Sequence, residues 1–342
     1  MSRATSISSP PGAPPNDGGA SLVIERDRST DEAWDRFAAS CGASFRAAHR
    51  AAGAWQLDHH PLHRMRRYAL WLNQGQLLRI GQVAIGFGPR LRVFADGIQL
   101  LPEHSGLWTQ AMSAVLAQTG RGLYHYGSAW SLEPARQGDC ASIAGVTLTT
   151  VEPITMYAID FSRWPTWDAY LREISNNARR NAKKVEKLQD RLTISVRHGM
   201  EMLRDATHLL RLRRALYVRK QIPFSMTANA LRLMLRAAVM RKNAFIAVAR
   251  VDDVPVAAFG GVTFGVNTYF LDAGSLKEDN GVYWFLMLRM LHDAYERAPH
   301  GRFVTGAYYE TDPVSTGLDF FRYQCRAQGT PTSEFVFSYS GP

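Results

Sequence analysis

The stretch Asn243–Ser275, NAFIAVARVDDVPVAAFGGVTFGVNTYFLDAGS, is rich in β-branched and aromatic residues and is interrupted at Asp252–Asp253 and at Gly265. Such residues favour strands, and Asp and Gly at the interruptions favour turns. Three consecutive strands are therefore predicted. The next segments, GVYWFLMLRMLHDAYERA (281–298) and RFVTGAYY (302–309), predict a helix and a further strand.

The first half of the chain shows the same order of elements. SLVIERD (21–27) predicts a strand, and a helix over Thr30–Ser40 follows with Thr30 as its N-cap. Three strands are then predicted between 67 and 101, a helix over 107–120 and a strand over 122–130.

Particular residues recur at an offset of about 175 residues, which is typical of a duplicated domain rather than of a short repeat. The matched positions are Phe94, Asp96, Gly97, Gly106 and Gly127 in the first half and Phe270, Asp272, Gly274, Gly281 and Gly306 in the second. The sequence predicts a mixed α/β protein with a leader over 1–20, a first domain over 21–150 and a second over 151–342. One large mixed sheet without a duplication is the alternative.

Most of the positive charge lies in one segment, residues 175–220. It holds thirteen Lys or Arg and four Asp or Glu, a net charge of +9, in a chain whose total is +10. Two basic helices are predicted here, the first capped by Ser175 or Asn176 and the second over Glu201–Arg219. Charge this localised indicates a surface for an anionic partner. A merely solvated helix face is the alternative.

The composition narrows the choice of function and location. Three cysteines, far apart and odd in number, argue against disulfides and a structural zinc site, and a cytoplasmic location is predicted. The residues 1–20 are rich in Ser, Pro and Gly, without the apolar core of a secretory signal. No apolar run is long enough for a transmembrane helix. His59 and His63 are separated by Pro61, so no metal is expected. The many aromatics are interpreted as sheet and interdomain core rather than as base-stacking groups.

The order of elements and the run R-R-x-x-K-K-x-x-K, which begins at Arg179, resemble the GNAT acyltransferases. The closer resemblance is to the branch with the FemAB-type peptidoglycan bridge ligases and the acetyltransferases of exopolysaccharide clusters. That resemblance implies two tandem GNAT-like domains, with the phosphate-rich donor or acceptor bound by the basic run. The residues it singles out in the run are Arg179, Arg180, Lys183 and Lys184.

In such a fold, strands that splay at a bulge expose main-chain amides for an acyl carbonyl, and a helix N-terminus receives the donor's phosphates. The resemblance places that slot at Gly274, Ser275, Asn280, Gly281 and Val282. The loop before the helix departs from the coenzyme A pattern Q/R-x-x-G-x-G/A. Acyl-CoA, an acyl carrier protein and aminoacyl-tRNA therefore all remain possible donors.

Three residues are candidates for acid–base chemistry: Tyr308, Glu310 and Asp272. A carboxylate can take the proton of the attacking amine, and a tyrosine can protonate the leaving group. The sequence thus predicts transfer of an acyl or aminoacyl group to an amine of a small molecule or cell-envelope precursor. The alternative is a non-catalytic protein that binds RNA or an anionic membrane on a degenerate acyltransferase fold.

Overall fold

The structure, a computed structural model, describes residues 21–277, 281–309 and 316–342. The first half comprises β1 (Ser21–Arg26), α1 (Asp31–Ser40), a 3₁₀ turn (Phe45–Ala47), α2 (His49–His59), β2 (Arg64–Asn73), β3 (Leu77–Phe87), β4 (Leu91–Leu100), α3 (Trp108–Thr119), β5 (Gly122–Tyr126), α4 (Gln137–Ala141) and β6 (Val146–Asp160). The second comprises α5 (Trp167–Glu173), α6 (Asn176–Lys183), a 3₁₀ segment (Lys184–Arg191), β7 (Leu192–His198), α7 (Leu203–Arg219), α8 (Met226–Met240), β8 (Ala244–Val251), β9 (Val254–Phe264), β10 (Asn267–Ser275), α9 (Val282–Arg297), β11 (Arg302–Tyr309), α10 (Thr316–Gln324) and β12 (Gln328–Tyr339).

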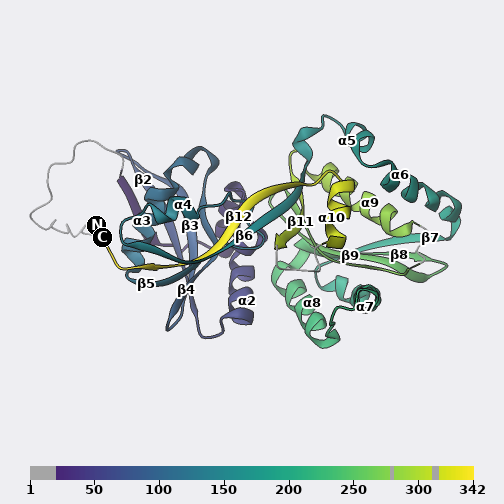
Figure 1. The fold of residues 1–342 in the computed structure, drawn as a ribbon, viewed down its shortest axis with the longest axis horizontal. Coiled ribbons are helices and arrows are strands. Elements are labelled where there is room, and N and C mark those ends of the chain that lie inside the picture. Colours follow the sequence, from purple (N-terminus) through teal and green to yellow (C-terminus); the bar gives the residue numbers. More distant parts are fainter. Residues whose placement is uncertain (1–20, 278–280, 310–315) are drawn as a thin grey trace, which may run out of the picture.

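The strands of the described residues form one sheet of twelve, in the order β1-β2-β3-β4-β5-β12-β6-β11-β10-β9-β8-β7. The two ends of this sheet mirror each other. β4 pairs parallel with β5 as β10 pairs parallel with β11, and the strands preceding them pair antiparallel in both halves. The predicted tandem of two GNAT-like units is confirmed, and the two units share a single sheet (Figure 1).

The halves exchange strands at the centre of the sheet. β6 follows β5 in the chain but pairs with β11 of the second half, whereas β12 follows the second half and pairs with β5 of the first. β6 and β12 also pair with each other along their length. The boundary predicted at residue 150 falls inside β6, and Figure 1 shows both strands running across the middle of the molecule.

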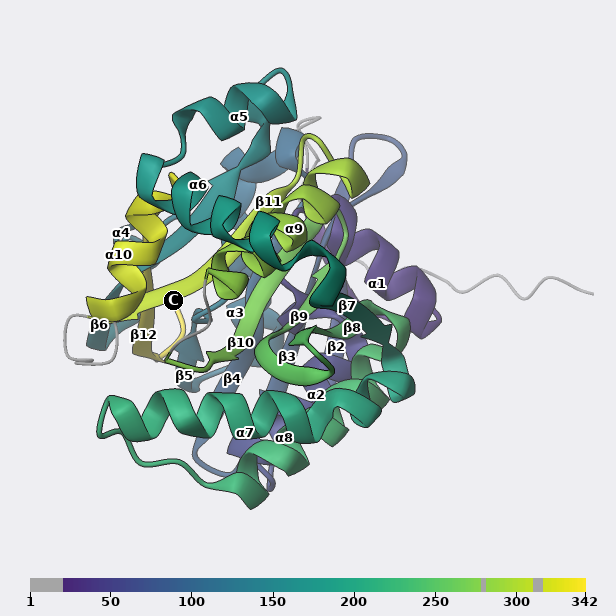
Figure 2. The same ribbon diagram turned by 90° about the vertical axis from the view of Figure 1, so that its right-hand side faces the viewer.

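Helices cover both faces of the second half (Figure 2). α7 and α8 pack on one face over Ala258, Val262 and Tyr269, while α5, α6 and α9 cover the other over Phe259 and Phe303. The apolar side of each helix is therefore buried, and the two faces of this part of the sheet are separate environments.

The basic segment does not consist of helices alone. α6 begins after Ser175, whose hydroxyl accepts a hydrogen bond from the Ala178 amide as predicted, and α7 lies within two residues of the predicted second helix. Residues 192–198, between the two predicted helices, form β7, an edge strand antiparallel to β8 that was not predicted. The alternation of Ile194 and Val196 with polar residues suits an edge strand better than a helix.

Candidate active site

In the second half, a bulge and a splay of strands meet at β10. The antiparallel register of β10 against β9 shifts between Phe270 and Asp272, which makes Leu271 the extra residue. The parallel pairing of β10 with β11 ends at Tyr269 and Val304. The extra residue of a bulge is left out of the ladder, so main-chain groups are available at this opening.

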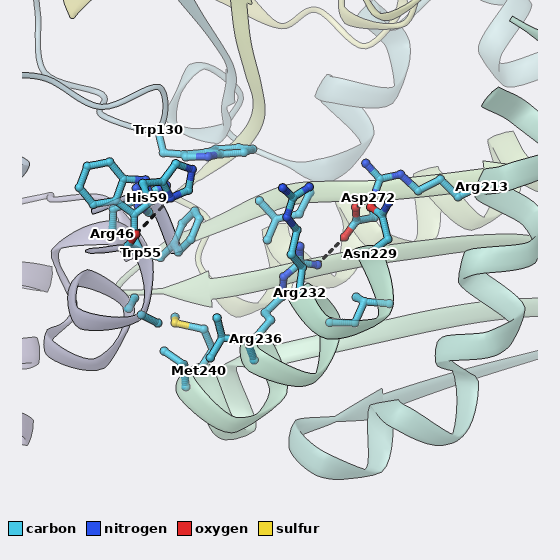
Figure 3. A pocket seen from close by; sticks show the side chains of 17 residues that line it. Arg46, Trp55, His59, Trp130, Arg213, Asn229, Arg232, Arg236, Met240 and Asp272 are labelled. Atoms are coloured by element: carbon cyan, nitrogen blue, oxygen red, sulfur yellow. Dashed lines mark hydrogen bonds and ion pairs between the residues drawn. The ribbon is translucent and has the colours of Figure 1, made fainter. Parts of the chain in front are cut away.

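A cleft of about 460 Å³ lies against this bulge, between the two halves (Figure 3). Trp55 and His59 line it from α2 and Trp130 from the loop after β5, while Arg232 and Arg236 line it from α8. The complete lining is Phe45, Arg46, Ala51, Ala54, Trp55, His59, Trp130, Arg213, Asn229, Arg232, Leu233, Leu235, Arg236, Val239, Met240, Leu271 and Asp272. Four arginines face one carboxylate, so the cleft carries a strong positive charge.

Asp272 organises the charged side of the cleft. Its side chain is only 4% exposed, and each of its carboxylate oxygens accepts a hydrogen bond from a different guanidinium, Arg213 or Arg236. Burial alone would raise the pKa of Asp272, but the charges and hydrogen bonds of the two arginines outweigh burial and hold it below its ordinary value. Asp272 is therefore an ionised anchor for the two arginines and a weak proton acceptor.

Arg232 differs from its neighbours because it is exposed and forms no hydrogen bond or ion pair with any residue in the described part of the chain. It lies on the face of α8 that also presents Asn229 and Arg236, at helical spacings of three and four. Across the cleft, the Arg46 guanidinium carbon lies 4.4 Å from the centre of the Trp55 ring. Cationic and aromatic groups thus face each other across the opening, as Figure 3 shows.

The equivalent position of the first half is filled by the protein's own side chains. The register of β4 shifts between Phe94 and Ile98, and the Tyr126 hydroxyl accepts hydrogen bonds from the Ile98 amide (3.1 Å) and the Trp108 indole (3.0 Å). The same hydroxyl donates to Glu133 at 2.9 Å. Burial raises the pKa of Tyr126 well above its ordinary value, so the hydroxyl stays protonated. A cavity of about 80 Å³ is left beside these residues, whereas the opening in the second half has about 460 Å³ and is the larger of the two.

The structure does not gather the predicted donor residues into one site. Arg179 and Lys183 border a groove beside α9, on the face opposite α7 and α8, whereas Asp272 lies in the cleft. Arg180 and Lys184 are exposed to solvent, and Ser275 is the last residue of β10. Val282 is the first residue of α9, and its side chain is buried in the core. A Cβ at Gly281, where φ is 85°, would overlap the Asn181 carbonyl of α6.

Gly274 contacts the main chain of α7, because a Cβ there would overlap the backbone of Leu212 and Arg213. We expect Gly274→Ala to lower the free energy of unfolding by about 3 kcal/mol. Gly53→Ala on α2 is the matched control, since nothing lies within 4 Å of a Cβ there, and Ala should stabilise that helix by up to about 1 kcal/mol. Urea unfolding measures the free energy of unfolding of both variants. Unchanged stability in Gly274→Ala, with loss of donor binding only, would contradict this packing role.

Of the acid–base candidates, Tyr308 is half-buried on β11 and does not line the cleft. Glu310 and Asn280 lie outside the described residues. The cleft residues that sequence reasoning missed are Arg46, Trp55, Trp130, Arg232 and Arg236. The sequence does contain a signal for two of them, because Arg232 and Arg236 are four residues apart and are the charged residues of a largely apolar helix.

Comparison with known proteins relates the second half of the chain to a family. Residues 172–310 match the model of the acetyltransferase (GNAT) domain. This segment is therefore similar to the acetyltransferase (GNAT) domain family. The matched residues include the cleft's α7, α8 and β10, so the family match and the open splay point to the same half. No curated protein matches the sequence.

Solved structures support the tandem GNAT fold over nearly the whole chain. FemX is similar with a TM-score of 0.67 and 11% identity, over 92% of this chain and 97% of FemX. A conserved protein of unknown function from Bacteroides thetaiotaomicron gives a TM-score of 0.54 and 10% identity, over 93% of this chain and 100% of that one. The C-terminal domain of a putative lysylphosphatidylglycerol synthetase from Agrobacterium fabrum gives a TM-score of 0.50 and 12% identity, over 91% of this chain and 93% of that domain.

Two further properties of the described residues bear on this site. In the part of the chain that the structure describes, no group of three or more His, Cys, Asp or Glu residues is placed to hold a metal ion. None of the described helices combines the length and the apolar composition needed to span a membrane. The cleft's chemistry, as described, is that of guanidinium and aromatic groups.

Proposed function

We propose that this chain transfers an acyl or aminoacyl group from a thioester or aminoacyl-tRNA donor to an amine of a small molecule or cell-envelope precursor. The observation that carries this proposal is the arginine-lined cleft at the β10 bulge, in the half that matches the GNAT family. The fold shared with FemX and with a putative lysylphosphatidylglycerol synthetase supports aminoacyl transfer as one form of this chemistry.

In this reaction the amine nitrogen attacks the acyl carbonyl carbon, and the carbon–sulfur or ester carbon–oxygen bond to the leaving group breaks. The attacking nitrogen loses a proton and the thiolate or ribose oxygen gains one. The main-chain amide of Leu271 would stabilise the oxyanion, because the bulge leaves this residue outside the ladder and its side chain lines the cleft. We propose Glu310 as the proton acceptor and Asp272 as a positioning residue. Tyr308 is the candidate proton donor from the sequence, and because it does not line the cleft, this role requires a substrate that extends beyond the cleft toward β11.

The arginines would hold the phosphate-bearing substrate. Arg232 has no partner in the described residues, and Arg236 is fixed by its ion pair with Asp272. A guanidinium held in this way is preorganised, and it can donate two hydrogen bonds to one phosphate. The aromatic side chains Trp55 and Trp130 lie opposite and can cover an apolar or planar part of the same ligand.

We expect Arg232→Ala to weaken binding of the phosphate-bearing substrate by about tenfold or more, since hydrogen bonds to charged groups contribute about 1.5–3 kcal/mol. A thermal-shift panel of acyl-CoA species, aminoacyl-tRNA and nucleotide sugars identifies the ligand, because a ligand at 100 times its Kd stabilises by about 2.7 kcal/mol. Lys220→Ala is the control, because Lys220 is an exposed cation that does not line the cleft.

Two results would count against the proposal. If no donor or nucleotide sugar stabilises the protein while RNA or anionic vesicles bind it in a salt-sensitive way, the chain is a binding protein on this fold. If a donor does stabilise it but Arg232→Ala and Lys220→Ala shift the affinity equally, the cleft is not the substrate site.

A further inference from the structure

A second concavity, on the opposite face of the sheet, has a different chemistry from the arginine cleft. It has a volume of about 760 Å³ and lies between α5, α6, β7 and α9. In Figure 2, α6 and α9 lie on one side of the sheet and α7 and α8 on the other. The proposed transfer reaction makes no use of this groove.

The walls of the groove are apolar. Leu171 of α5, Val185 after α6, Ile194 of β7 and Leu288 of α9 line it together with Phe285. All but Val185 are half-buried at the edge of the core cluster beneath α9, so apolar surface remains accessible in a concave site. A volume of this size is within the range of small-molecule pockets, about 300–1,000 Å³.

Cations stand along one edge of this groove. Arg179 and Lys183, on successive turns of α6, line it and form no ion pair with any described residue. The Arg179 side chain donates a hydrogen bond to Asn176, which carries no charge, whereas Arg289 is already paired with Asp293 at 2.9 Å. Glu186 is the acidic residue in the lining. The lining therefore has more cations than acids, and Arg179 and Lys183 have no ion-pair partner among the described residues. Such an apolar groove fits a ligand with an apolar chain and an anionic end.

The same groove fits a nucleic acid poorly. Binding of single strands requires aromatic faces on which bases stack. The Trp167 ring, the lining aromatic next to the basic residues, is already packed against Tyr170, His292 and Tyr295 at centroid distances of 5.1, 4.9 and 5.8 Å. The apolar walls offer no hydrogen bonds to base edges.

We propose that this groove binds a single long acyl chain that ends in an anionic group, with the chain between α5, β7 and α9 and the anion at Arg179 and Lys183. Dodecanoate is the probe, and dodecanol and dodecylamine of the same chain length test the charge. Binding measured by calorimetry on the full chain is expected to be tightest for dodecanoate. Each CH₂ added from octanoate to dodecanoate is expected to tighten binding about fourfold.

Two variants test separately how the apolar walls and the cationic edge contribute to binding. Ala182→Trp fills the groove from α6 and is expected to abolish dodecanoate binding. Lys183→Glu is expected to lower the affinity for dodecanoate at least tenfold. Lys187→Glu makes the same charge change at an exposed position outside the lining, and it should leave binding unchanged. Thermal unfolding of each variant shows whether it is folded, and Lys183→Glu keeps the test valid if Ala182→Trp does not fold.

Equal affinity for dodecanoate, dodecanol and dodecylamine would overturn the proposal, as would an equal effect of Lys183→Glu and Lys187→Glu. Binding to vesicles of phosphatidylglycerol without binding of monomeric dodecanoate would overturn it too, because the surface would then recognise a bilayer. The Arg232→Ala variant, altered only in the cleft, is expected to bind dodecanoate normally. The acyl-chain groove and the proposed transfer site can therefore fail independently.

Discussion

A chain that ends at Ala327, before β12, is expected to lose the fold of its first half. β12 pairs with β5, and its Phe335 and Phe337 side chains are at most 1% exposed in the core of the first half. Each buried Phe contributes about 3–5 kcal/mol, whereas the whole stability of a domain is about 5–15 kcal/mol. Hydrogen exchange of β5 and α3 peptides should rise to the rate of an unfolded chain.

A graded form of this experiment uses single substitutions. Phe337→Ala, whose ring stacks on Tyr124 with centroids 5.2 Å apart, is expected to lower the free energy of unfolding by about 3–5 kcal/mol. Phe320→Ala on α10 makes the same change at a side chain that is 62% exposed, and it should stay within about 0.5 kcal/mol of the parent. Native protection of β5 in the truncated chain would show that the first half folds without β12.

The strand exchange explains why sequence reasoning found the elements but not their partners. Alternating and β-branched residues identify β8, β9 and β10, and the Thr30 cap is where it was predicted, accepting a hydrogen bond from the Ala33 amide. Those signals are local. Nothing local in β12 indicates that it pairs with a strand some two hundred residues earlier, because pairing depends on the shape of the whole sheet.

The cleft was missed for a related reason. Its walls come from α2, α8, β10 and the loop holding Trp130, which are distant in sequence. α2 itself was not predicted, since its Ala- and Gly-containing sequence lacks a clear apolar periodicity. The charge count, by contrast, directed attention to α6. Local density of charge does not distinguish Arg213, which is committed to Asp272, from Arg179, which borders a groove on the other face.

Asp272→Asn is expected to lower the free energy of unfolding at pH 7 by about 3 kcal/mol, because it removes the charge that Arg213 and Arg236 share in a buried site. The pKa of Asp272 is depressed in the folded protein. Its contribution is therefore complete above the unfolded value, about 3.9, and is lost as the pH falls through that value toward the folded one. Urea unfolding between pH 3 and pH 7 should show that the free energies of unfolding of the parent protein and Asp272→Asn become more similar as the pH falls.

Asp205→Asn is the control that separates stability from function. Asp205 is 2% exposed and also bridges two arginines, Arg250 at 2.6 Å and Arg197 at 3.0 Å, but it lies outside the cleft. The free energy of unfolding should fall by a similar amount in both variants, and only Asp272→Asn should change kcat or KM.

The kinetic pattern then decides what Asp272 does. A residue that positions Arg236 on a substrate phosphate should raise KM when lost, with a smaller effect on kcat, and the pH profile should keep its shape. A general base contributes about 10²–10⁴-fold, so its loss would lower kcat by that factor and remove the ascending limb of the profile. The paired guanidiniums favour the first pattern, since a carboxylate that they hold ionised is a poor acceptor for an ammonium proton. The second pattern in Asp272→Asn, with Asp205→Asn unaffected, would make Asp272 the proton acceptor and leave Glu310 without that role.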